Sequence, residues 1–91
     1  MTRVRKDYFF RLVMRNKQRI KVVKDWHFDG FVDGRVYDNR IVPVDGFLAF
    51  VGPGSANYKC VVVYDEGGGR YIVCDQWGGQ LYSYTVELSP D

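Results

Sequence analysis

The chain has 91 residues, of which 46% are hydrophobic and 16% aromatic, and its formal net charge is +2. This length allows one hydrophobic core, so we expect residues 1–91 to form a single β domain. The hydrophobic content excludes an intrinsically disordered chain. No apolar run approaches the ~18 residues of a membrane span, and the N-terminal segment lacks the apolar stretch of a secretory signal. We therefore expect a soluble, cytoplasmic protein that makes no membrane contact.

Positive charge is concentrated near the N-terminus. Residues 1–24 contain nine Lys and Arg residues and one acidic residue, Asp7, which gives this segment a net charge of +8. Residues 25–91 contain four Lys and Arg residues and ten acidic residues, a net charge of −6. Such an asymmetry indicates an acidic binding partner more strongly than the overall charge does.

The first predicted element is a hairpin in which residues 8–15 pair with residues 19–26. Pairing Arg15 with Arg19 leaves Lys17 in the turn and gathers Arg11, Arg15, Arg19 and Lys21 on one face. The alternative is a helix over residues 7–17 with Asp7 as its N-cap. We favour the strands, because the apolar residues of this segment would spread around most of a helix circumference.

The middle of the chain, residues 28–51, is predicted to form two or three short strands. Frequent Asp-Gly and Gly-rich turn signals separate short runs of Val, Ile, Tyr and Phe here and elsewhere. Pro43 has no N–H to donate, which indicates an edge strand or a bulge at this position.

A second hairpin is predicted between residues 58–64 and residues 70–75. Centring its turn on Gly67 places Val62 opposite Ile72 and makes Cys60 and Cys74 a possible cross-strand cysteine pair. Directly opposed cysteines are close enough to be bridged in some geometries. In a reducing cytosol we expect two free thiols.

The last predicted strand covers residues 81–88, where Tyr82, Tyr84, Val86 and Leu88 share one face. This period of two is typical of a half-buried strand. Together these elements predict an all-β fold: a small antiparallel barrel or sandwich of about six to seven short strands built from hairpins.

The predicted function is that of a small, non-catalytic binding module. Its basic N-terminal hairpin would dock nucleic acid, or an acidic surface of a protein that handles nucleic acid and that it inhibits or adapts. The predicted binding residues are Arg11, Arg15, Lys17, Arg19 and Lys21. Trp26, Trp77 and Tyr37 lie beside turns, where an exposed ring can stack on a base. The alternative reading of the basic face is a solvated surface that protects a sheet edge.

Two further classes of function stay open. One is a structural subunit that associates with itself through its open sheet edges; the chain would be a monomer or a homodimer formed through such an edge. The other, with less support, is a small hydrolase centred on His27, the single histidine of the chain. No serine-nucleophile motif accompanies His27, and a zinc site would need two more ligands at suitable spacing, so we expect no metal and no cofactor.

Overall fold

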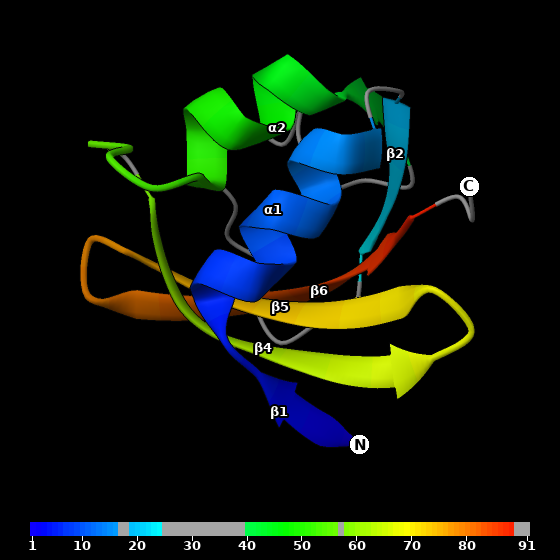
Figure 1. Ribbon diagram of the computed structural model, residues 1–91. Coiled ribbons are helices and arrows are strands. Elements are labelled where there is room, and N and C mark those ends of the chain that lie inside the picture. The colour runs from blue at the N-terminus through cyan, green and yellow to red at the C-terminus, as the bar shows by residue number, and fades with distance from the viewer. Residues whose placement is uncertain (17–18, 25–39, 57, 89–91) are drawn as a thin grey trace.

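The computed structural model describes residues 1–16, 19–24, 40–56 and 58–88, which form an antiparallel sheet with two short helices against one of its faces (Figure 1). The elements are β1 (Thr2–Val4), α1 (Lys6–Asn16), β2 (Arg19–Lys24), β3 (Arg40–Pro43), α2 (Val44–Val51), β4 (Lys59–Gly67), β5 (Arg70–Trp77) and β6 (Gln80–Glu87). Among the described residues the strand order is β1-β4-β5-β6-β2-β3, with β1 and β3 at the two open ends. The predicted all-β class and strand number are therefore confirmed.

The predicted first hairpin is wrong, because the segment after β1 forms the helix α1. Phe9, Phe10 and Val13 fall on one side of α1 and are buried. Tyr8 and Met14 lie on the other side and remain exposed. The apolar residues do spread around the helix, as the sequence indicates, but only part of that circumference faces the core. The alternative helix over residues 7–17 is close to what the structure shows.

The middle of the chain is also partly different from the prediction. Residues 28–39 lie outside the described residues, and residues 40–51 form one strand and one helix. In α2, Val44, Phe47 and Val51 are buried at helical spacing, i, i+3 and i+7. The predicted edge position of Pro43 is confirmed, because it is the last residue of the edge strand β3.

Two tight turns connect the last three strands. Gly68 and Gly69 join β4 to β5 with φ values of 66° and 81°, and Gly78 and Gly79 join β5 to β6 with φ values of 58° and 88°. Positive φ at both central residues is the requirement of the two-residue hairpin turn that matches the twist of the strands. These Gly pairs therefore determine where each hairpin reverses.

The predicted β4–β5 hairpin exists, but its register is displaced from the predicted one. Tyr64, rather than Val62, pairs with Ile72, because the turn is centred on Gly68 and Gly69 instead of Gly67. Cys60 pairs with Asp75 and Cys74 pairs with Val62, with a bulge at Val61 between the two pairs. The predicted directly opposed cysteine pair is therefore wrong, and both thiols are free.

The hydrophobic core lies between the two helices and the sheet. Cross-strand neighbours Val63, Val73 and Tyr84 are all buried on the face that the helices cover. Phe9 of α1 lies at the centre, with ring centroids 5.3 Å from Tyr71 and 6.4 Å from Phe47 of α2. These aromatic contacts join both helices to the strands and fix the orientation of α1, whose opposite side faces solvent.

Candidate functional site

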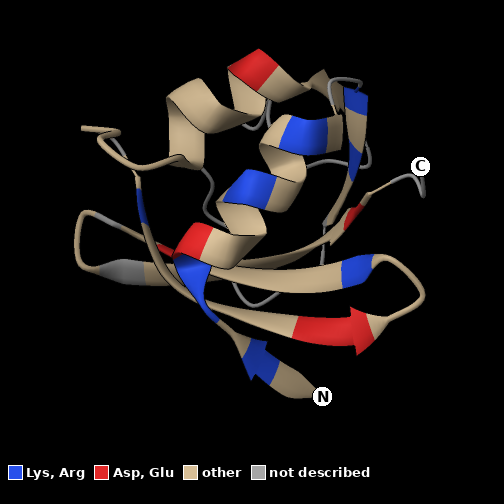
Figure 2. Cartoon of the chain, in the orientation of Figure 1, with Lys and Arg blue, Asp and Glu red and all other residues tan. Residues whose placement is uncertain are grey.

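The solvent-facing side of α1 carries the first candidate site, which we call the α1 outer face and define as Tyr8, Arg11, Met14 and Arg15. These residues follow i, i+3 and i+4 spacings, which place side chains on one side of a helix. Tyr8 is 45% exposed, Met14 59% exposed, and the Arg11 side chain 66% exposed. Lys and Arg residues occur along α1 (Figure 2). The result is a surface strip that combines positive charge with exposed apolar atoms.

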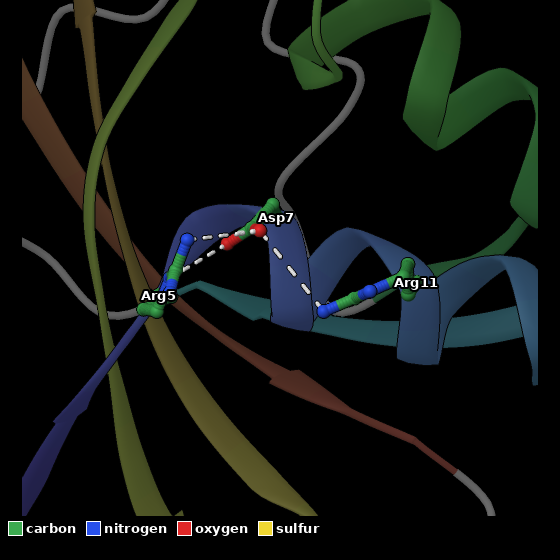
Figure 3. A network of polar contacts seen from close by, with 3 residues as sticks. All are labelled: Arg5, Asp7 and Arg11. Carbon is green, nitrogen blue, oxygen red and sulfur yellow. Dashed lines mark hydrogen bonds and ion pairs between the residues drawn. The ribbon is translucent and has the colours of Figure 1, made fainter.

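Asp7 is the acidic residue at the start of this strip (Figure 3). Its Oδ1 lies 3.3 Å from Arg5 Nε, and its Oδ2 lies 4.0 Å from an Arg11 terminal nitrogen. Slight desolvation raises the pKa of Asp7, but the backbone N–H of Tyr8 and the two guanidinium groups lower it more, so its pKa is below the ordinary value. One carboxylate shared by two Arg residues leaves the strip positively charged.

The structure does not bring the predicted binding residues onto one face. Arg11 and Arg15 lie on α1, whereas Arg19 and Lys21 lie on β2. The latter two alternate with Ile20 and Val22, which are fully buried against the helices, so Arg19 and Lys21 project from the other face of the sheet. Lys21 Nζ lies 3.9 Å from Glu87 Oε1. Lys17 is outside the described residues.

The structure describes only one of the predicted stacking and catalytic residues. Trp77 ends β5, where it pairs with Gln80. Trp26, His27 and Tyr37 lie outside the described residues. Within the described ranges, no group of three or more His, Cys, Asp and Glu side chains is arranged to hold a metal ion. Neither described helix is long and apolar enough to cross a membrane.

The two cysteines, Cys60 of β4 and Cys74 of β5, are poor nucleophiles. Burial raises the pKa of the Cys60 thiol to about 12, and the charge of Asp75 contributes to the increase. Burial also raises the pKa of Cys74. Because the thiolate is the reactive form, neither group is activated for chemistry at neutral pH.

The second candidate site is a groove of about 970 Å³ at the end of the sheet where α1 begins. Its walls are the start of α1, the loop that follows α2, the first residues of β4, and the end of β5 with the turn that follows it. Arg5, Lys6 and Lys59 line it together with Phe10 and Tyr58. This groove is not evident from the sequence, because its walls come from segments more than 40 residues apart. The Gly-rich residues 52–56 were the available signal, since such a loop allows close approach to its backbone.

Comparisons with known proteins give no relative: no family model, curated protein or solved structure matches the chain. The α1 outer face and the groove are therefore the features of the molecule that indicate a function.

Proposed function

We propose that this protein is a non-catalytic binding module that docks an acidic surface of a partner protein through the α1 outer face. The observation that carries the proposal is the exposure of Tyr8 and Met14 on either side of Arg11 and Arg15 on one side of a packed helix. The opposite side of α1 is held by Phe9, Phe10 and Val13, so the strip is presented on a rigid element. Docking of this kind would make the domain an adaptor or an inhibitor of its partner.

The composition of the strip favours a protein over a nucleic acid. Tyr, Met and Arg are enriched in protein–protein interfaces, whereas Lys, Asp and Glu are depleted there. Tyr8 and Met14 would bury apolar area against a partner, and Arg11 and Arg15 would select for acidic residues around that area. Nucleic acid, whose phosphates attract the same Arg side chains, is the alternative partner.

The charge distribution supports fast association with an acidic partner. The net charge of +8 on residues 1–24 is far larger than the +2 of the whole chain. Complementary charge steers diffusional encounter and raises the association rate at low salt. Two free cysteines are in keeping with a reducing compartment, and we expect docking to occur in the cytoplasm.

A role in self-association through the sheet edges has less support. Among the described strands β1 and β3 lie at the edges; they span three and four residues, and β3 ends at Pro43. Short edge strands and edge prolines are features that prevent strand pairing between molecules. The high thiol pKa values of Cys60 and Cys74 likewise favour binding over catalysis by cysteine.

The proposal is tested by quantitative affinity capture from a cell lysate with three immobilised proteins. These are the wild type, the double variant Arg11→Glu/Arg15→Glu, and the variant Arg19→Glu/Lys21→Glu, which has the same charge change on β2. We expect a partner retained by the wild type and by the β2 variant and lost by the α1 variant. Equal retention by all three proteins would contradict docking through α1.

Fluorescence anisotropy with single- and double-stranded DNA and RNA distinguishes the alternative partner. Measurements at about 50 and 200 mM salt cover the range in which phosphate contacts weaken strongly. We expect the wild type and the Arg11→Glu/Arg15→Glu variant to show no difference in affinity for any of these nucleic acids. A steep salt dependence that is abolished in the α1 double variant would replace the acidic protein with nucleic acid as the partner.

A further inference from the structure

The groove beside α1 is separate from the α1 outer face. Arg5, which precedes α1, and Lys6, Asp7 and Phe10 of α1 line the groove, whereas Arg11 and Arg15 do not. Its volume of about 970 Å³ is at the upper end of the range for specific ligand sites. A ligand here would therefore be recognised by different residues from those that carry the proposed function.

One wall of the groove is a length of strand edge. β1 pairs only with residues 63–65 of β4, so the start of β4 extends past the end of β1. Among the described strands, none pairs with residues 59–62 of β4 on this side. Lys6 Nζ lies here and donates a 3.2 Å hydrogen bond to the carbonyl oxygen of Cys60. Lys59 and Cys60 of this edge line the groove, which thus reaches backbone groups that an extended chain is able to pair with.

The charges around this edge select which chain can pair with it. Arg5, Lys6 and Lys59 line the groove, and Asp7 is the acidic residue among the lining residues. The bulge at Val61 and the nearby Lys side chains oppose pairing with a second copy of this basic edge. An acidic strand would remove that repulsion, because its carboxylates would lie beside the ammonium and guanidinium groups.

The interior of the groove is apolar. Phe10, Val51 and Tyr58 form its floor; they belong to the core and are at most 6% exposed. A strand places alternate side chains on opposite sides. A peptide in which acidic and apolar residues alternate would therefore lay its apolar set over this floor and direct its acidic set toward Lys59 and solvent.

We propose that the groove binds an extended acidic peptide, which adds to the sheet beside residues 59–62 of β4. A backbone N–H of the peptide would donate to the Cys60 carbonyl oxygen, which now accepts a hydrogen bond from Lys6 Nζ. The Lys6 ammonium group would then pair with a carboxylate of the peptide. The site goes beyond the proposed function and does not depend on it, because the peptide contacts none of the four residues of the α1 outer face.

The test is fluorescence anisotropy with a labelled eight-residue peptide in which Glu alternates with Val. We expect saturable binding that weakens with salt and falls about tenfold for Lys59→Glu, since this change replaces an attraction by a repulsion. Arg15→Glu, with the same charge change on α1, is the matched control and should leave the affinity within a factor of two. If Arg15→Glu weakens binding and Lys59→Glu does not, the peptide binds the α1 outer face and the groove proposal is overturned.

A change in the peptide tests the strand pairing without altering the fold of the protein. N-methylation of alternate peptide N–H groups removes the donors that an added strand needs, while charge and side chains stay the same. We expect this peptide to bind at least tenfold more weakly in one of the two N-methylation registers. If both N-methylated peptides bind as tightly as the unmethylated peptide, the groove is an anion site without strand addition and the proposal is overturned. The same conclusion follows if free glutamate at the same carboxylate concentration binds as tightly as the peptide.

Discussion

Tyr84 donates a 2.7 Å hydrogen bond from its hydroxyl to Asp75 Oδ2 inside the core. The two residues lie on adjacent strands, β6 and β5, and both are almost completely buried. A carboxyl group is costly to bury unless donors satisfy it, so this contact makes an acidic residue tolerable between apolar neighbours. Asp75 also pairs with Cys60 of β4, which places the contact beneath the wall of the groove.

Loss of the Tyr84 hydroxyl should therefore weaken the fold. We predict that Tyr84→Phe lowers the free energy of unfolding by about 1.5–3 kcal/mol, the range for hydrogen bonds to charged groups. Urea denaturation followed by circular dichroism measures the change. Tyr64→Phe is a suitable control, because Tyr64 is only partly buried, and we expect less than about 0.5 kcal/mol there. Equal effects of the two substitutions would mean that the contact with Asp75 contributes no stability.

The β4–β5 turn offers a test of the register. Gly68 and Gly69 both have positive φ, but a Cβ at Gly69 would lie 2.9 Å from the Leu88 carbonyl oxygen, whereas a Cβ at Gly68 would meet nothing within 4 Å. We predict that Gly68→Ala costs about 1 kcal/mol, the conformational cost alone. Gly69→Ala should cost more, about 2 kcal/mol or above, because strain adds to that cost. Urea denaturation of both variants gives the comparison, and a larger loss at Gly68 would contradict the described turn.

The position of α1 is tested by two neighbouring aromatic residues. Phe9 is fully buried and contacts Phe10, Phe47 and Tyr71, whereas Tyr8 is 45% exposed. We predict that Phe9→Ala lowers stability by about 3–5 kcal/mol, enough to unfold much of a small domain. Tyr8→Ala should cost less than about 1 kcal/mol. In the hairpin that the sequence predicts, Tyr8 and Phe10 share the apolar face, so a large loss at Tyr8 would favour that hairpin over α1.

The buried thiol of Cys60 should make stability depend on pH in alkaline solution. Its pKa in the folded protein is about 12, against 9.0 ordinarily, so the unfolded chain loses the thiol proton at lower pH. The contribution of the protonated Cys60 thiol to the free energy of unfolding is present in full below pH 9. It is lost as pH rises toward 12, by up to about 1.4 kcal/mol per pH unit.

Urea denaturation at pH 8 and pH 10.5 checks this expectation. We predict that Cys60→Ala is less stable than the wild type at pH 8, because it leaves a small cavity, and that the difference narrows or reverses at pH 10.5. Both proteins retain Cys74 and Tyr71, whose pKa values are also raised, so the comparison isolates Cys60. A constant difference at the two pH values would show that Cys60 ionises as easily in the folded protein as in the unfolded chain.

The sequence predicts the strand-rich half of this fold well. Alternation in residues 81–88 predicts β6 and its buried residues Tyr82, Tyr84 and Val86, and the Gly clusters predict the reversals on both sides of β5. The β4–β5 register was more difficult, because three consecutive Gly residues allow several turn centres. The bulge at Val61 adds a shift that no local pattern indicates.

The helices and the sites were harder to predict, for a physical reason. Tyr8 and Met14 are apolar residues that remain exposed, so the periodicity of α1 is obscured by the residues that make it a candidate interface. In α2, Val44, Phe47 and Val51 have helical spacing, but Pro43 and Gly46 suggest a broken strand. The basic residues of the first 24 positions were identified as a group, whereas their division between α1 and β2 depends on tertiary structure.

The most direct test of docking through α1 is site-specific photo-crosslinking in cells. A benzophenone amino acid at Met14 would lie on the α1 outer face, where Met14 is 59% exposed, and one at Leu81, which is 53% exposed on β6, serves as the control. The account predicts a covalent adduct with an acidic protein from position 14 alone, which disappears when Arg11→Glu and Arg15→Glu are added. An adduct from Leu81 alone, or one from position 14 that persists after both Arg changes, would contradict it.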